Sequence, residues 1–180
     1  MSDPVPFRPS DAARWLTVPH GESTKYRRGV LGVATGSDRY PGAAVLGVDA
    51  AVHTGVGMVR YVGPARATDH VLTRRPESVS GVGRVQAWLV GSGISAPSLD
   101  DLDDATADAF RHASDDGVPV VVDAGAIPLV DLGPLAVLTP HAGEAASLLG
   151  ESRDEVEADP AAAALRAARQ TGSVVLLKGE

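Results

Sequence analysis

Short apolar runs rich in β-branched residues alternate along the chain with longer segments whose apolar positions recur at helical spacing. The runs predict six strands, at residues 30–35, 58–62, 87–90, 119–123, 135–139 and 173–177. Several are apolar at consecutive positions, which is typical of parallel strands covered on both faces. This alternation predicts an α/β fold with a parallel sheet and helices on both faces.

The segments between the strands predict four helices, at residues 42–53, 99–116, 144–149 and 161–169. Asp159 and Pro160 precede the last helix in the order typical of an N-cap and a first helical position. Four aspartates lie at residues 100–104, where a helix dipole favours negative charge, so we interpret them as a helix start rather than a metal site. Residues 64–84 show no clear period, and we expect a loop at residues 74–77.

Composition narrows the possible functions. The chain has 180 residues, which predicts one domain, and 16 basic against 23 acidic residues give a net charge of −7. This balance argues against a nucleic-acid partner. The absence of cysteine excludes disulfides, thiolate zinc sites and cysteine nucleophiles. Residues 1–15 lack a signal-peptide pattern and no stretch predicts a membrane span, so we expect a cytoplasmic protein without a membrane partner.

Glycine and polar residues follow most of the predicted strands. They occupy positions 36–38, 91–93, 123–125, 139–144 and 178–179. Ligands of open α/β sheets bind beyond the carboxyl ends of the strands, so these segments predict a binding site. Neither a G-x-G-x-x-G fingerprint nor a P-loop is present, so any nucleotide must be bound by another kind of motif.

Individual residues at these strand ends allow two interpretations each. Small residues at 42–44 leave helix amides open to a phosphate or pack closely on the sheet. Asp123 contacts a ligand or caps a neighbouring helix. His141 donates a hydrogen bond to a ligand or caps the helix at 144–149. Lys178 meets a phosphate or faces solvent.

Taken together, these segments resemble one known family. The matching motifs are Lys25–Gly29, Tyr40–Leu46 with Gly55–Gly57, Val90–Gly93, Asp123–Ala126, Leu138–Glu144 and Val175–Gly179. Over residues 25–180 they are similar, in the correct order, to the ADP-dependent NAD(P)H-hydrate dehydratases, which have a ribokinase-like fold. Leu138–Glu144 is close to L-T-P-H-P-G-E, the most specific of these motifs.

The resemblance implies dehydration of the S-epimer of NADHX or NADPHX back to NAD(P)H, with ADP or ATP as co-substrate together with Mg²⁺. It implies that Ala43, Gly93 and His141 contact the hydrate, and that Lys178 and Gly179 begin the nucleotide-binding segment. It also implies a homo-oligomer. No residue of the chain is expected to ligate a resident metal ion.

The chain also departs from the family pattern. Ser92 and Ala142 replace prolines, which we expect to loosen two loops. The family's G-T-G-D motif, whose aspartate resembles the catalytic base of ribokinase-like kinases, is absent from residues 1–180. Neither Asp38 nor Asp123 takes its place, so we assign no catalytic residue and expect slow phosphorylation.

The expected organisation is an N-terminal arm at residues 1–24 and a partial dehydratase domain at residues 25–180, with the fold incomplete at the C-terminus. Two alternatives remain open. One is a ribokinase-like kinase for a small alcohol such as a vitamin precursor. The other is a non-catalytic fragment that binds a nucleotide or a partner.

Overall fold

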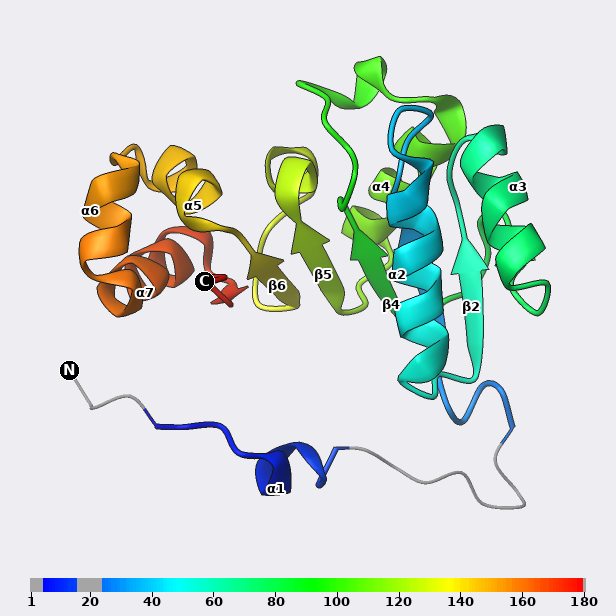
Figure 1. The fold of residues 1–180 in the computed structure, drawn as a ribbon, viewed down its shortest axis with the longest axis horizontal. Helices are drawn as coiled ribbons and strands as arrows, with labels where there is room; N and C mark the ends of the chain where they lie inside the picture. Colours follow the sequence, from blue (N-terminus) through cyan, green and yellow to red (C-terminus); the bar gives the residue numbers. More distant parts are fainter. Residues whose placement is uncertain (1–4, 16–23, 180) are drawn as a thin grey trace.

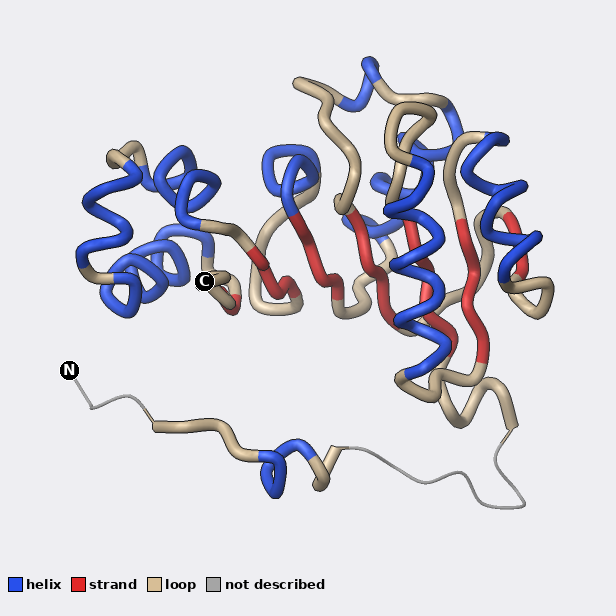
Figure 2. The backbone as a smooth tube through the Cα atoms, in the orientation of Figure 1, coloured by secondary structure: helices blue, strands red, loops and turns tan. Residues whose placement is uncertain are grey.

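A single parallel sheet organises the molecule. The computed structural model describes residues 5–15 and 24–179, in which seven strands pair in the order β3-β2-β1-β4-β5-β6-β7. The strands are β1 (Val30–Ala34), β2 (Met58–Tyr61), β3 (Val79–Ser80), β4 (Ala87–Val90), β5 (Val120–Asp123), β6 (Ala136–Thr139) and β7 (Val174–Val175). All six pairings are parallel, which confirms the predicted α/β class (Figure 2).

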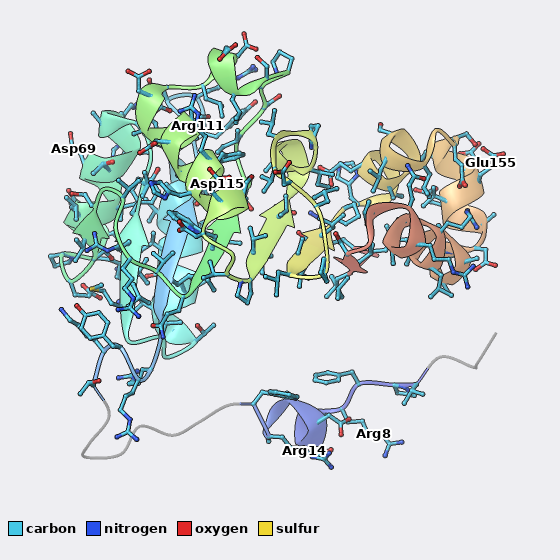
Figure 3. The ribbon with its side chains drawn as sticks, turned by 180° about the vertical axis from the view of Figure 1, so that it is seen from behind. Arg8, Arg14, Asp69, Arg111, Asp115 and Glu155 are labelled. Carbon is cyan, nitrogen blue, oxygen red and sulfur yellow. The ribbon has the colours of Figure 1, made fainter. Side chains whose placement is uncertain are left out.

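Helices cover both faces of this sheet. The helices of the described residues are α1 (Pro9–Ala12), which lies apart from the sheet, and α2 (Pro41–His53), α3 (Ala65–Arg74), α4 (Asp104–Asp115), α5 (Ala142–Leu149), α6 (Arg153–Ala158) and α7 (Pro160–Thr171), with 3₁₀ turns η1 (Leu99–Asp101) and η2 (Ala124–Leu129). Figure 1 shows α2 in front of the sheet and α4 behind it. Seen from behind, α4 carries the exposed side chains of Arg111 and Asp115 (Figure 3).

Two apolar cores lie on the opposite faces because side chains alternate along each strand. On β1, Val33 belongs to the core that α2 and α3 cover, whereas Val30 and Ala34 belong to the core that α4 covers. Trp88 and Phe110 are the largest side chains of the second core, and both are almost fully buried. The predicted two-sided burial of the sheet is therefore confirmed.

The third apolar cluster joins α5, α6 and α7 at the β7 end of the sheet (Figure 1). Its buried members are three alanines and Val156, and Leu177 packs against them. Asp159 caps α7 by accepting a hydrogen bond from the Ala162 amide at 3.0 Å, as predicted. The sequence prediction omitted α6, because Val156 is its only buried residue and so leaves no apolar period to detect.

Two other predicted segments, residues 64–84 and the helix from residue 99, also differ from the structure. Residues 64–84 form α3 and β3 as well as a loop, and Arg74 ends α3 rather than lying in that loop. Only Ala67 and Val71 of α3 are buried, which explains the weak pattern. The helix expected from residue 99 is η1 followed by α4, whose N-cap Asp103 accepts a hydrogen bond from the Thr106 amide.

The strand expected at residues 173–177 is shorter, although its backbone continues beside β6. Only Val174 and Val175 form β7, but the Leu176 amide still donates to the Leu138 carbonyl at 2.8 Å. This continuation matters for the site because it brings residue 178 next to the end of β6.

The N-terminal arm remains a prediction, since residues 1–4 and 16–23 lie outside the described part. In the part between them, α1 has no buried residue, and Phe7 and Trp15 are largely exposed. Within the described ranges, no helix combines the length and apolarity that crossing a bilayer requires.

Candidate functional site

The central strands end level with one another, so the segments that follow them share one edge of the sheet. The register pairs Ala34 with Val90, Val90 with Val122, and Asp123 with Thr139. The Gly36 amide donates to the Ser92 carbonyl at 2.6 Å, which ties the exits of β1 and β4 together. The predicted clustering of polar and glycine segments at the carboxyl edge is thus observed.

The first group at this edge is the glycine turn, which we define as Gly36, Ala43 and Gly93. A Cβ atom placed on Gly93 would lie 2.5 Å from the Ala43 Cβ and 3.2 Å from the Gly36 Cα, and the Gly93 φ is +75°. The Ser37 hydroxyl donates to the Gly93 carbonyl at 2.9 Å. Two of the three residues expected to contact the hydrate, Ala43 and Gly93, therefore lie together on a tightly packed surface of backbone and methyl groups.

The start of α2 explains part of this packing. The Thr35 hydroxyl donates to the Ala43 carbonyl at 3.3 Å, and a Cβ on Gly47 would lie 2.8 Å from that hydroxyl oxygen. The Ala43 amide donates within the chain, to the Tyr40 carbonyl at 3.1 Å. These contacts support close helix–sheet packing as the reason for small residues here, while phosphate binding by α2 stays a prediction.

The second group is the Asp123 cluster, which we define as Asp123, Ser92, Thr139 and Lys178. Asp123 Oδ2 accepts from the Ser92 hydroxyl at 2.6 Å, and Oδ1 accepts from the Thr139 hydroxyl and the Lys178 Nζ, each at 2.7 Å. The Asp123 side chain is 19% exposed and the Lys178 side chain 39%. Asp123 therefore does not cap η2 with its side chain, and both charged residues gain a partner that their sequence context did not reveal.

The ionisation of Asp123 follows from these contacts. Burial raises the pKa of Asp123. The hydrogen bonds from Lys178, Ser92 and Thr139, together with the charge of Lys178, lower the pKa by more than burial raises it. The net result is a pKa below its ordinary value. The carboxylate is consequently ionised at neutral pH and holds the lysine ammonium as an ion pair.

His141 is the N-cap of α5. Its Nδ1 accepts hydrogen bonds from the amides of Gly143 and Glu144 at 3.0 and 3.2 Å, and Glu144 Oε2 accepts from the His141 amide at 2.9 Å. The capping interpretation is confirmed. Because Nδ1 is an acceptor, the neutral ring carries its proton on Nε2, which lies 3.3 Å from Glu144 Oε1. The side chain is 59% exposed, so a ligand can reach it.

A cavity of about 640 Å³ adjoins the second group. Its lining residues come from α5, α6, α7 and the segment after β7: His141, Ala142, Arg153, Val156, Glu157, Pro160, Leu177, Lys178 and Gly179. A backbone bridge also pairs His141 with Lys178. The volume falls in the usual range for ligand sites, roughly 300–1,000 Å³.

The five predicted site residues thus lie in two places, the glycine turn and the cavity beside the Asp123 cluster. Ala43 and Gly93 belong to the glycine turn, whereas His141, Lys178 and Gly179 line the cavity. Ser92 connects them, because its carbonyl accepts from Gly36 while its hydroxyl donates to Asp123.

Ser92 also makes a contact that its place in the sequence does not reveal. Its hydroxyl connects the exits of β4 and β5 by donating to Asp123, while the looser turn expected from replacement of a proline stays a prediction. Ala142 likewise begins α5, where the His141 cap holds the chain. The prediction missed Ser92 and Thr139 as donors to Asp123; a hydroxyl just past the end of β4 and another at the end of β6 were the available signal. Arg153 and Glu157 were missed because they lie on α6.

An all-parallel α/β sheet with a glycine turn and a lysine-lined cavity at its carboxyl edge is the arrangement of open α/β sheet proteins, whose ligands bind at this edge. Residues 31–180 match the sequence profile of the family described as NAD(P)H-hydrate dehydratase. The chain therefore belongs to this family, as its motifs predicted.

Individual relatives agree with this assignment. The chain is 43% identical over 192 residues to the bifunctional NAD(P)H-hydrate repair enzyme Nnr of Mycobacterium tuberculosis, which covers 99% of the chain but 38% of that enzyme. It is 32% identical over 191 residues to the ADP-dependent (S)-NAD(P)H-hydrate dehydratase of Xanthomonas campestris, covering 93% of the chain and 63% of that enzyme. The chain thus spans less than two thirds of the length of either relative.

Solved structures confirm the ribokinase-like fold. The ADP/ATP-dependent NAD(P)H-hydrate dehydratase of Bacillus subtilis, co-crystallized with ATP and Mg²⁺, superimposes with a TM-score of 0.79 at 25% identity, covering 97% of this chain and 67% of that one. A ribokinase-like superfamily protein of Enterococcus faecalis gives a TM-score of 0.74 at 19% identity over 91% of this chain and 62% of its own, a likeness of fold alone.

Proposed function

We propose that this chain acts in the nucleotide-dependent dehydration of the S-epimer of NADHX and NADPHX to NAD(P)H. The observation that supports this proposal is the position of the family's motif residues. The five residues that the motifs assign to the site all lie at the carboxyl edge of one sheet, in two groups that Ser92 joins. They are Ala43, Gly93, His141, Lys178 and Gly179.

The two groups suit two different ligands. The glycine turn offers backbone at close approach, which suits a flat ring, so we place the hydrated nicotinamide against Ala43 and Gly93. The exposed His141 Nε2–H can donate a hydrogen bond to the hydrate while Nδ1 keeps the cap of α5. Lys178 lies at the cavity as a point charge, which suits a phosphate of ADP or ATP.

The nucleotide fits the residues present. The cavity is large enough for a ligand, and the Lys178 ammonium is fixed at its wall. When bound, the nucleotide supplies the phosphoryl group that activates the ring hydroxyl for elimination. We expect the base that removes the hydroxyl proton to be the aspartate of the family's G-T-G-D motif, which residues 1–180 do not contain.

Mg²⁺ fits this arrangement as a companion of the nucleotide. Among the described residues, no group of three or more histidines, aspartates or glutamates is placed to hold a metal ion. Mg²⁺ usually binds through one or two carboxylates together with substrate phosphates, so it does not need such a group. We therefore expect Mg²⁺ to arrive with ADP or ATP.

A direct assay tests the proposal. NADHX is supplied with ADP and Mg²⁺, and the recovery of NADH is followed by its near-ultraviolet absorbance. We expect a version of the protein that includes the G-T-G-D motif to recover NADH and the 180-residue chain to be much slower. If neither form recovers NADH and neither binds ADP in calorimetry, the proposed function is wrong.

The same assay tests the role of the G-T-G-D aspartate. Full recovery by the 180-residue chain would contradict the expectation that the G-T-G-D aspartate is required. Lys178→Met is the matched variant, because methionine keeps the unbranched apolar stem and removes the charge. It is expected to weaken ADP binding without changing the KM for NADHX.

Two further properties remain predictions that accompany the proposal. One is a cytoplasmic location, and the other is a homo-oligomeric state. Light scattering on a sizing column measures the second directly, and a mass equal to one chain would contradict it.

A further inference from the structure

We propose that Asp123 is a positioning residue that fixes the Lys178 ammonium in the orientation needed by a nucleotide phosphate. This inference rests on the proposed function, because it assigns Asp123 a role at the nucleotide side of the same site. It concerns a residue that contacts the lysine and not the substrate itself.

The geometry of the carboxylate carries the proposal. Asp123 receives hydrogen bonds from three separate parts of the chain: Ser92 after β4, Thr139 at the end of β6, and Lys178 after β7. Oxygens held by two hydroxyl donors cannot swing freely, so the third donor is held against a fixed point. Asp123 itself ends β5, an inner strand whose backbone pairs with β4 on one side and β6 on the other.

Lysine needs such a fixed point more than most side chains. Its ammonium lies on a flexible four-carbon stem, and many rotamers are open to it at a partly exposed position. Here the stem is restrained at both ends. The Lys178 amide donates to the Pro140 carbonyl at 2.8 Å, and its Nζ donates to Asp123 at 2.7 Å.

The ion pair leaves the lysine able to bind an anion. An ammonium has three donors, and Asp123 Oδ1 accepts from one of them. Lys178 also lines the cavity, whereas Asp123 is not part of its wall. A phosphate in the cavity therefore meets the ammonium, while the carboxylate lies behind it.

Asp123→Asn removes the charge while keeping the shape, and ADP binding by calorimetry is the measurement. We expect ADP to bind about tenfold more weakly to this variant, the effect of losing one charge-assisted hydrogen bond. Ser92→Ala is the matched control, because it removes a donor to Asp123 but leaves the ion pair. It is expected to change ADP binding less than about threefold.

A double-mutant cycle separates positioning from a merely structural role. If Asp123 acts through the lysine, Asp123→Asn has no further effect on ADP binding in the Lys178→Met background. Equal weakening in both backgrounds, or wild-type or tighter ADP binding by Asp123→Asn, would overturn the inference while leaving the proposed function intact. A wild-type chain that binds no ADP would instead remove the proposed function and this inference together.

A second substitution covers the case in which Asp123→Asn does not fold. Asp123→Glu keeps the charge but moves the carboxylate by one methylene, so it should weaken ADP binding by a smaller factor that also vanishes with Lys178→Met. Unchanged binding by a folded Asp123→Glu variant counts against the inference.

Discussion

On the β1–β4 side of the carboxyl edge, the site surface is made of backbone and methyl groups, whereas on the β5–β7 side it is made of charged side chains. Gly36, Ala43 and Gly93 pack so closely that no further carbon fits between them. Asp123 and Lys178, by contrast, are held by hydrogen bonds and charge beside an open cavity. Substitutions on the first side should act through steric overlap, and those on the second through electrostatics.

The largest expected effect tests the steric side. Gly91 has φ +113°, and a Cβ there would overlap the Asp123 carbonyl oxygen. Gly91→Ala should therefore lower the free energy of unfolding by about 3 kcal/mol, because backbone strain and overlap add. Gly81→Ala is the control, since Gly81 has φ +86° but open space around it, and should cost about 1 kcal/mol. Equal losses in urea unfolding would show that overlap is unimportant.

The next effect concerns activity on the same side. Gly93→Ala places a methyl group against Ala43 and shifts the turn. A misplacement near 1 Å can cost about 100-fold in rate, so kcat/KM for NADHX should fall by about that factor. ADP binding should change little, because Lys178 is on the other side. A parallel loss of ADP affinity would mean that the two sides are not independent.

Substitutions at His141 can separate two roles of this side chain, because it caps α5 and is also exposed where a ligand can contact it. His141→Ala should lower stability by about 1 kcal/mol through loss of the N-cap, whereas His141→Asn should restore it, since asparagine is a good N-cap. Both variants should raise the KM for NADHX, because neither has the Nε2–H. Wild-type KM in His141→Asn would assign the histidine to capping alone.

The smallest effect is the pH dependence of the ion pair. The folded-state pKa of Asp123 lies below its ordinary value of 3.8, so ionised Asp123 stabilises the fold above that pH. This contribution is lost as the pH falls through the folded-state pKa. Lys178 is 39% exposed, so the contribution should stay below about 1 kcal/mol. Urea unfolding of wild type and Asp123→Asn should differ at pH 6 and converge in acid; a constant difference would contradict the assignment.

Elements with a strong local pattern were predicted well. Burial leaves apolar runs in the sequences of β5 and β6 and small residues in α2. Capping leaves the Asp159–Pro160 pair at the start of α7. Elements with one or two buried residues, such as α3 and α6, were not recognised. A helix that buries little surface imposes no apolar period on its sequence.

The site followed the same rule. Its location at the strand ends could be predicted because parallel strands bring their carboxyl ends to one edge. The cap formed by His141 was among the predicted alternatives, since the cap is local. The partner of Asp123 was not predicted, because Lys178 lies 55 residues away along the chain.

The sequence by itself determined the alternation of strands and helices, the edge at which the motifs gather and the family to which they belong. Only the tertiary structure decided that Ala43 and Gly93 form one surface, that His141, Lys178 and Gly179 line a separate cavity, and that Ser92 joins the two. The physical reason is the strand order, in which β1 pairs with β4 and β6 with β7. Local patterns fix each strand, but which side chains meet depends on which strands become neighbours.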